Sequence, residues 1–305
     1  QIKKYVEDCW ESCGYAVLLF HGVTEIEEMG CRNSNKKHLH ALEFKKILAF
    51  LQSVDANFML MSDLERGINS GKPLNKVACI TFDDGFRNNL HTAIPLLKDF
   101  DAKATIYVTT DFIEMNLMSW IDRVEYAVEK TNLKLLEIYN HQFSLNSIEE
   151  KIQCLKDIRR IFKQNKIEKN ILASEIQNKL IGKEVYSNES DLDQKLNWSE
   201  VKQIESMEDF EIGAHTISHP SLSHLEIDDQ YLEIYESLKI ISEKTGSKIN
   251  LFAYPEGTQN DFNQTTIQVL KELGIKSSPS AVPFNIKGID ELYSIPRLNC
   301  DHEIL

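Results

Sequence analysis

The sequence predicts an α/β protein built as a parallel sheet or as a barrel. Short apolar runs alternate along the chain with segments in which apolar residues recur at helical spacing. This alternation is typical of parallel sheets, because a parallel strand pair needs a long crossover connection that is usually a helix. The 305 residues allow one large α/β domain or two small ones.

The predicted strands are short apolar runs of five to seven residues, bounded by polar or turn residues. They are 16–20 (AVLLF), 77–82 (VACITF), 103–109 (KATIYVT), 210–214 (FEIGA) and 249–254 (INLFAY), with one more expected near 292–296. Such runs, apolar on both faces, are typical of strands covered by helices on a parallel sheet.

Helices are predicted between these strands, over 41–54, around Leu90–Leu97, over 227–241 and in a segment that stops at Gly274. The third is the clearest, because its apolar residues keep i, i+4 and i+7 spacing. Gly246 follows it and suits the left-handed position that often ends a helix.

Residues 111–195 show no convincing pair of strands and are predicted to form a helical insertion. One helix is expected to start at Trp120. Another is expected to start at Ser147, where SIEE suggests an N-cap and a capping box closed by Glu150. Residues 182–195 are polar and are interpreted as a linker. We therefore expect a single barrel domain over 1–305 that carries this insertion.

Composition and charge exclude several classes of function. The net charge of −13 argues against a nucleic-acid partner, which would need clustered Lys and Arg, and disfavours anionic lipid. No stretch approaches 18 consecutive apolar residues, so no transmembrane segment is expected. No signal peptide is visible and the six cysteines are sparse, which together predict reduced thiols and a cytoplasmic location. The oligomeric state is not predicted.

Unusual polar residues follow several of the predicted strands. Asp83 and Asp84 come directly after 77–82, and His215 and His219 come directly after 210–214. His21 follows 16–20, and Glu256 lies just after 249–254. The carboxyl ends of parallel strands form the edge at which α/β proteins build their sites. These side chains are therefore expected at one rim.

Two histidines four residues apart are a common way to present two nitrogen ligands to one metal ion. In a helical turn, both imidazoles of His215 and His219 would lie on the same side. Asp83 or Asp84 could add a carboxylate ligand, which would leave positions open for water and substrate. Either motif alone is weak evidence for a metal site, since Asp-Asp-Gly usually forms a solvated turn. The two motifs together at one rim are more specific evidence.

The ordered motifs TFDDG, HTISHP and FAYPEG resemble those of the polysaccharide deacetylases, carbohydrate esterase family 4. The resemblance covers about residues 16–110 and 196–298. It implies a distorted (β/α) barrel with about seven parallel strands. The helical insertion lies outside the motifs and resembles a subgroup associated with surface-polysaccharide biosynthesis.

The resemblance also implies roles for the rim residues. Asp84, His215 and His219 would hold a divalent metal ion, with zinc as the expected ion, and Asp83 would be the general base. The backbone N–H of Glu256 would stabilise the oxyanion. The implied substrate is an N-acetylated sugar in a glycan, a glycolipid or a surface-polysaccharide precursor.

Two residues of the family pattern are missing from their usual places. The stretch 251–254 has no arginine to orient the base, and Arg297 in SIPRL is the proposed replacement. No Leu-x-His motif supplies the general acid. His21, which is expected to face the site, and His224 and His302 are the candidates.

Other interpretations stay open. One is a degenerate deacetylase-like module that binds a glycan or a partner protein, and another is a hydrolase of a non-sugar amide. A serine hydrolase is disfavoured, because the chain has no Gly-x-Ser-x-Gly elbow. His38 and His40 are expected in a solvated loop. Trp120 and Trp198 are expected as anchors of helix starts and not as sugar platforms.

Overall fold

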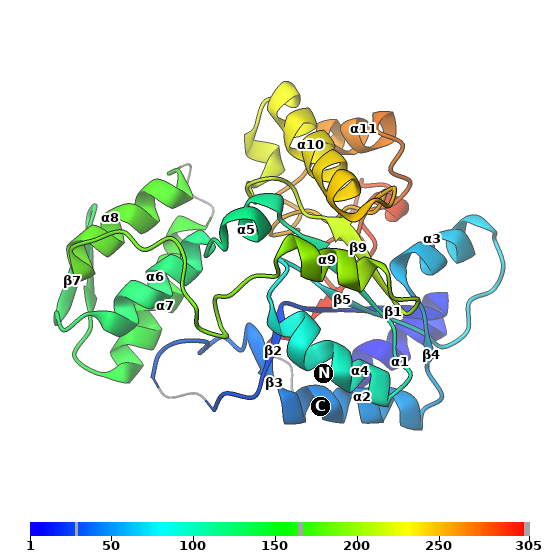
Figure 1. Ribbon diagram of the computed structural model, residues 1–305, viewed down its shortest axis with the longest axis horizontal. Coiled ribbons are helices and arrows are strands. Elements are labelled where there is room, and N and C mark those ends of the chain that lie inside the picture. The colour runs from blue at the N-terminus through cyan, green and yellow to red at the C-terminus, as the bar shows by residue number, and fades with distance from the viewer. Residues whose placement is uncertain (28–29, 164–166, 302–305) are drawn as a thin grey trace.

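The computed structural model describes residues 1–27, 30–163 and 167–301. Its main sheet has six strands, all of them parallel, in the order β10-β1-β5-β6-β9, with β4 paired to the start of β5 (Figure 1). The strands are β1 (Tyr15–Phe20), β4 (Asn57–Phe58), β5 (Val77–Phe82), β6 (Ala104–Val108), β9 (Phe210–Ala214) and β10 (Leu298–Asn299). A small second sheet pairs β2 (Gly22–Thr24) with β3 (His38–His40). The predicted α/β class with a parallel sheet is confirmed.

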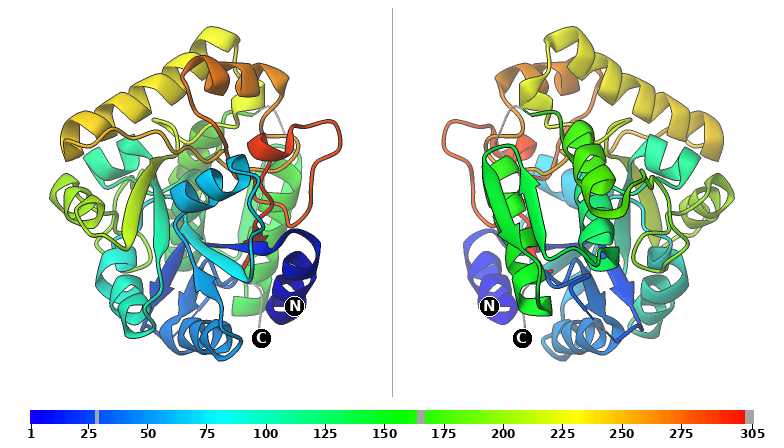
Figure 2. Two further views of the ribbon diagram at one scale, coloured as in Figure 1. Left: turned by 90° about the vertical axis from the view of Figure 1, so that its right-hand side faces the viewer. Right: turned by 90° about the vertical axis from the view of Figure 1, so that its left-hand side faces the viewer.

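Helices cover the outer side of this sheet (Figure 2). They are α1 (Ile2–Cys13), α2 (Ala41–Ser53), α4 (Ile94–Asp99), α9 (Trp198–Glu205), α10 (Ile227–Thr245) and α11 (Gln264–Glu272). A further helix, α3 (Met61–Asn69), packs on the opposite face, where Met61 and Leu64 join a smaller apolar cluster. A π-helical turn, η1 (Asn89–Ala93), leads into α4, and 3-10 turns lie at η2 (Leu222–His224) and η3 (Glu291–Tyr293). As predicted, α10 ends at Gly246, whose φ of 81° is left-handed.

Successive residues of each strand point to opposite faces of the sheet. Leu18, Ile80 and Ile106 pack into the large core shared with the outer helices, whereas Val17, Cys79 and Tyr107 form a smaller cluster on the other face. The second face is the interior of the barrel. Asp83 continues the register of its residues and therefore starts from the inner side.

Two predicted strands are not regular strands, and this explains the distortion of the barrel. Residues 249–254 form only a single parallel bridge, between Phe252 and Ala214. On the side of the segment away from Ala214, the Phe252 carbonyl accepts a hydrogen bond from the Ser278 hydroxyl instead of pairing with a second strand. Near 292–296, the 3-10 turn η3 takes the place of the expected strand. Asp290 caps the start of η3, and Pro296 has no N–H to donate to a neighbouring strand. The parallel bridge between Pro279 and Ile295 continues the wall toward β10.

The insertion forms a lobe beside the barrel, seen at the left of Figure 1 and in green in Figure 2. It follows α5 (Thr110–Met115) and contains α6 (Trp120–Lys130), β7 (Leu135–Ile138), β8 (His141–Ser144), α7 (Ile148–Phe162) and α8 (Lys169–Ile181). The expectation of no strand pair is wrong, because β7 and β8 form an antiparallel hairpin. Buried and exposed positions alternate along the hairpin, and the buried side chains of Leu136, Ile138 and Phe143 join a separate apolar cluster. The two-residue alternation typical of strands is therefore present in the sequence, but only over short segments.

Ser147 caps α7 as predicted, since its hydroxyl accepts from the N–H of Glu150. The Glu150 carboxylate accepts from the N–H of Asn146, the residue before the cap. All six cysteines lie in the described residues, and no disulfide joins them. Among the helices of the described ranges, none is long and apolar enough to cross a membrane.

Candidate active site

Asp83 and Asp84 reach one cavity because the chain turns sharply between them. The N–H of Asp83 still donates to the Phe20 carbonyl of β1, at 3.0 Å. Asp84 then has a φ of 72° and Gly85 a φ of 73°, so two successive left-handed residues turn the chain. A left-handed aspartate is uncommon and costs free energy, which makes this turn typical of a functional site.

His215 and His219 come together through a loop and not through the helical turn considered from the sequence. Thr216 and His219 have left-handed φ values of 67° and 63°. The Thr216 hydroxyl accepts from the N–H of His219, and the Glu233 carboxylate accepts from two neighbouring N–H groups of the loop. These bonds fix the loop with the two imidazole rings 5.0 Å apart.

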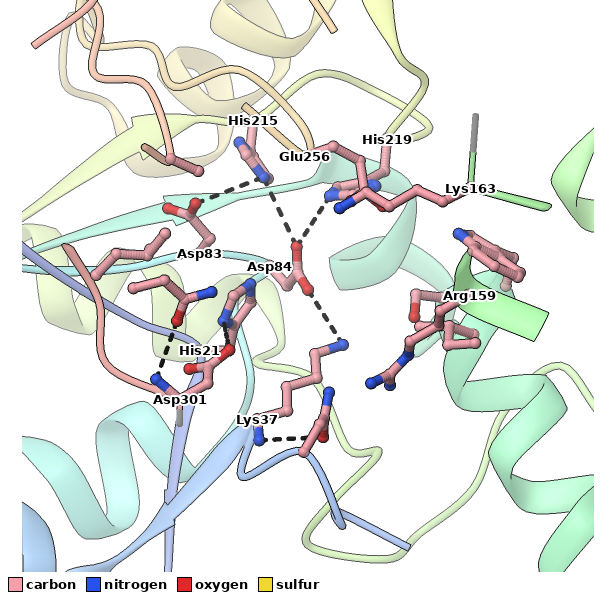
Figure 3. A pocket seen from close by; sticks show the side chains of 17 residues that line it. His21, Lys37, Asp83, Asp84, Arg159, Lys163, His215, His219, Glu256 and Asp301 are labelled. Carbon is pink, nitrogen blue, oxygen red and sulfur yellow. Dashed lines mark hydrogen bonds and ion pairs between the residues drawn. The ribbon is translucent and has the colours of Figure 1, made fainter. Parts of the chain in front are cut away.

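Asp84, His215 and His219 converge on one point in the described part of the chain. Asp84 Oδ1 lies 3.2 Å from His219 Nε2 and 3.7 Å from His215 Nε2, and one ligand atom from each residue falls within 4.8 Å of the others (Figure 3). Asp84 Oδ1 is buried and accepts no hydrogen bond of good geometry from the described residues. A buried carboxylate oxygen facing two imidazole nitrogens is a suitable setting for a divalent cation.

The surroundings prepare these groups as ligands. His215 Nδ1 donates to the Ala253 carbonyl at 2.8 Å, which leaves the Nε2 lone pair for the metal position. Burial lowers the pKa of His215 to about 4, so its imidazole is neutral at physiological pH. Phe112 stacks on the His219 ring at 5.7 Å. The Asp84 carboxylate raises the pKa of His219 against the effect of burial. Two imidazoles and one carboxylate form the three-ligand set of many catalytic zinc sites, so these residues fit the implied ion.

Arg297 lies beside Asp83. Its Nη1 and Nη2 donate to the two carboxylate oxygens, each at 2.8 Å, and its Nε donates to the Ser280 carbonyl. Burial alone would raise the pKa of Asp83, but the charge and the hydrogen bonds of Arg297 outweigh this effect, so this pKa lies below its usual value. Asp83 is therefore ionised at neutral pH and held in one orientation.

His21 also lines the cavity, and its Nδ1 lies 2.9 Å from Asp301 Oδ2. Burial would lower the pKa of His21, but the Asp301 carboxylate overcomes this effect and raises the pKa to about 9. His21 thus carries a proton at neutral pH. Of the other two candidates, His224 lines a neighbouring cavity, and His302 lies outside the described residues.

Glu256 stands at the turn after the Phe252 bridge and has a left-handed φ of 59°. No other described residue accepts a hydrogen bond from its backbone N–H. Its carboxylate pairs with Lys163 of the insertion at 2.7 Å. The Glu256 N–H is therefore available to a ligand at the rim of the cavity.

The cavity has a volume of about 270 Å³ and collects all seven sequence-predicted residues except Arg297, which lies behind Asp83. Sequence reasoning missed several of the lining residues, among them Lys37, Trp120, Arg159, Lys163 and Asp301. Asp301 lies two residues after the end of β10, so the strand-end rule could have found it. Lys37 lies in a loop without periodicity, and no signal in its neighbourhood marks it.

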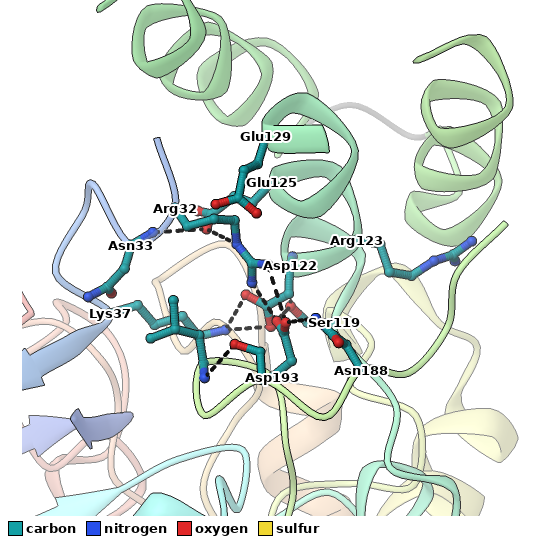
Figure 4. Close-up of polar contacts among 12 residues, drawn as sticks. Arg32, Asn33, Lys37, Ser119, Asp122, Arg123, Glu125, Glu129, Asn188 and Asp193 are labelled. Carbon is teal, nitrogen blue, oxygen red and sulfur yellow. Dashed lines mark hydrogen bonds and ion pairs between the residues drawn. The ribbon is translucent and has the colours of Figure 1, made fainter. Parts of the chain in front are cut away.

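Lys37 belongs to a group of buried charged residues (Figure 4) and also contacts Asp84 of the metal triad. Its Nζ lies 3.5 Å from Asp84 Oδ2 and 3.0 Å from Asp122 Oδ2, and Asp122 belongs to α6. Beside this pair, Arg32 contacts Asp193 and Glu125. A loop of the barrel, the first helix of the insertion and the returning linker therefore meet at one charged cluster.

Two minor expectations need correction or extension. His38 is buried and not solvated, because its Nδ1 accepts from the Asn88 amide and its ring packs edge-on against Phe86. His40 caps α2, since its Nδ1 accepts from the N–H of Leu42. Trp120 does begin α6, as expected, but it also lines the cavity.

Comparison with protein families finds that residues 70–278 match the family model described as polysaccharide deacetylase. Comparison with curated proteins gives no match.

Several solved structures share the fold. The Streptococcus pyogenes deacetylase PplD in complex with acetate is 17% identical with a TM-score of 0.55, over 88% of this chain and 84% of that one. The BpsB deacetylase domain from Bordetella bronchiseptica is 14% identical with a TM-score of 0.57, over 93% and 94%. A de-N-acetylase from Aggregatibacter actinomycetemcomitans is 15% identical with a TM-score of 0.56, over 90% and 91%.

Proposed function

The chain belongs to the polysaccharide deacetylase family, and we propose that it is a metal-dependent hydrolase that removes the N-acetyl group from an N-acetylated sugar in a glycan, a glycolipid or a surface-polysaccharide precursor. The observation that carries this proposal is the convergence of Asp84, His215 and His219 beside the Arg297–Asp83 pair. Acetate-bound and de-N-acetylase structures of the same fold support it.

Asp84, His215 and His219 would hold the divalent ion, for which zinc is the expected identity. When bound, such an ion lowers the pKa of water and polarises a carbonyl group. Asp83 accepts a proton from the attacking water, and Arg297 keeps Asp83 ionised and oriented for this task. Water adds to the acetyl carbon and the carbon–nitrogen bond then breaks, which gives acetate and a free amine.

Two further groups act on the developing charges. The Glu256 N–H donates to the carbonyl oxygen as that oxygen becomes negative. His21, protonated through its contact with Asp301, donates a proton to the leaving amine nitrogen. Arg297 and the His21–Asp301 pair thus occupy the two roles for which the sequence lacks the usual residues, and this favours catalysis over a binding module.

The test couples metal analysis to acetate release from a panel of N-acetylated sugars. The wild-type protein should bind one ion per chain and release acetate. Asp83→Asn should keep the ion but lose turnover, because it removes the base and not a ligand. Metal without acetate from any sugar would point to a non-sugar amide or to a binding role. A wild-type protein that binds no ion after reconstitution would refute the site.

A further inference from the structure

The two carboxylate oxygens of Asp84 have different surroundings. Oδ1 faces the two imidazoles, at 3.2 Å from His219 Nε2 and 3.7 Å from His215 Nε2. Oδ2 points away from them and lies 3.5 Å from Lys37 Nζ (Figure 3). A cation beside Oδ2 leaves Oδ1 as the free ligand atom of this carboxylate. The chemistry proposed above gives Lys37 no task.

Lys37 is fixed at both its backbone and its ammonium group. Its carbonyl accepts from the N–H of Gly22, which ties the residue to β2 just before β3 begins. Its Nζ lies 3.2 and 3.0 Å from the two oxygens of Asp122 and 4.8 Å from the centre of the Phe86 ring. The ammonium group beside Asp84 is therefore held in one place, unlike that of a flexible surface lysine.

Asp122 is in turn fixed by the first turn of α6. The Ser119 hydroxyl donates to Asp122 Oδ2 at 2.7 Å and accepts from the N–H of Asp122, and both residues are buried (Figure 4). Because α6 belongs to the insertion, the position of Lys37 depends on a part of the chain that contains none of the deacetylase motifs.

The number of oxygens that Asp84 can offer affects which ion fits the site. Zinc prefers four ligands, and two imidazoles with one carboxylate oxygen leave a position for water. Manganese prefers oxygen ligands in an octahedral arrangement, so a carboxylate that binds through both oxygens favours manganese. An ammonium group at Oδ2 opposes this second mode, because the ion and the ammonium group would meet at one oxygen and repel each other.

We propose that Lys37 is a positioning residue of the metal site, that it restricts Asp84 to one ligand oxygen, Oδ1, and that it thereby favours zinc over ions that prefer oxygen, such as manganese. The proposal rests on the metal-dependent function proposed above. Lys37 acts through Asp84 and is neither a ligand nor a catalytic residue. Through Asp122, the insertion then contributes to the ion selectivity of the barrel.

The experiment measures the dissociation constants of Zn²⁺ and Mn²⁺, by competition with a chelating dye, in the metal-depleted wild-type protein and in Lys37→Met. The readout is the ratio of the manganese constant to the zinc constant. Loss of a nearby positive charge strengthens the binding of both ions, and the ratio removes this common effect. The ratio should fall about 10-fold or more in Lys37→Met, because Asp84 can then bind manganese through both oxygens.

A double variant, Lys37→Met with Asp122→Asn, is measured beside the single one, because Lys37→Met alone leaves the buried Asp122 carboxylate without its cation. The ratio should fall as far in the double variant as in the single one, which would assign the effect to Asp84. A fall in the single variant only would mean that Asp122 binds the manganese, and would overturn the proposal.

Lys195→Met is the matched control. Lys195 is also buried and its Nζ lies over the same Phe86 ring, at 4.0 Å from the centre, but this Nζ donates to the Asp193 carbonyl. The variant loses one nearby positive charge and leaves the Asp84 oxygens as they are, so its ratio should stay within about twofold of the wild-type value. A fall as large as that in Lys37→Met would overturn the proposal.

Cobalt(II) in place of zinc gives a second readout, because four-coordinate cobalt absorbs visible light more strongly than six-coordinate cobalt. The absorption should fall in both Lys37 variants and stay unchanged in Lys195→Met. An unchanged ratio or an unchanged cobalt spectrum in both Lys37 variants would overturn the role of Lys37 and leave the metal site intact.

These measurements also separate the inference from the proposed function. The expected change of ratio in a protein that releases no acetate would support the role of Lys37 and refute only the hydrolase. A wild-type protein that binds none of the three ions would refute the metal site, and with it both the proposed function and the role of Lys37.

Discussion

Arg297 and Asp83 form a bidentate pair inside the barrel, although 214 positions separate them in the chain. Arg297 is fully buried, and its third donor, Nε, is fixed by the Ser280 carbonyl. Each nitrogen of this buried guanidinium donates a hydrogen bond, so the group does not reorient freely. The direction of the Asp83 carboxylate is therefore set by a residue far outside the motif that contains it.

Arg297→Lys should lower kcat by up to about 100-fold, the lower end of what a positioned base contributes. Lysine keeps the charge but cannot donate two parallel hydrogen bonds to one carboxylate. Because Arg297 is the main group that lowers the pKa of Asp83, the acidic limb of the pH–rate profile should also move to higher pH. Arg66→Lys, on an exposed pair of α3, is the control. An unchanged kcat and an unmoved acidic limb in Arg297→Lys would remove Arg297 from the mechanism.

Asp84→Ala and His219→Ala should each lose the bound ion. Each removes one of three ligands, and the remaining two cannot reproduce the set. The measurement is metal content after dialysis against a weak chelator, with His40→Ala as a control at a histidine that only caps α2. One ion per chain in both variants would mean that the ion is held elsewhere.

The pair of His21 and Asp301 predicts the basic limb of the pH profile. Acetate release should fall as pH rises through about 9, because His21 then loses the proton that it donates. Asp301→Asn removes the main group that opposes the effect of burial, so the pKa of His21 drops and the basic limb moves to lower pH. The exposed Asp99→Asn on α4 should leave the limb in place. A basic limb that is the same in wild type and Asp301→Asn would assign the proton donor to another group.

The same pair predicts a pH dependence of stability. The pKa of His21 rises from 6.5 to about 9 on folding, so protonation of His21 stabilises the fold most fully below pH 6.5. This contribution, on the order of 3 kcal/mol at most, should be lost as pH rises from 6.5 to about 9. Urea unfolding across this range measures it, and His21→Gln should flatten that part of the curve. An equally steep decline in His21→Gln would contradict the assignment.

The sequence revealed those site residues that obey the strand-end rule. Asp83, Asp84 and His215 follow strands directly, so their shared rim could be inferred from the alternation of strands and helices. His219 was found by its spacing from His215, although a loop with left-handed residues and not a helical turn presents it. The chemistry of the residues was therefore easier to predict than the backbone that positions them.

The remaining features depend on contacts between distant segments, which local patterns do not record. Lys37 is buried only because Asp84 and Asp122 meet it from two other elements. Residues 249–254 have a strand-like pattern, but only one side of the segment finds a backbone partner. In both cases tertiary structure overrides the local signal.

Lys37 and Asp122 should be energetically coupled. Lys37 Nζ lies 3.0 and 3.2 Å from the two oxygens of Asp122, and both side chains are buried. Lys37→Met leaves two carboxylates without their shared cation, and Asp122→Asn leaves the ammonium facing Asp84 alone. Each single change should therefore lower the free energy of unfolding by about 3–5 kcal/mol, as for other buried pairs that lose one partner.

The double variant should cost less than the sum of the two single changes, because removing both partners leaves no unpaired charge between them. Urea unfolding of the metal-free proteins gives the coupling free energy between Lys37 and Asp122, which we expect to be about 1–3 kcal/mol. The exposed pair Glu43 and Lys46 on α2 is the control, and its variants should each change stability by less than about 1 kcal/mol. Strict additivity at Lys37 and Asp122 would show that the charged cluster does not join α6 of the insertion to the loop beside the metal site.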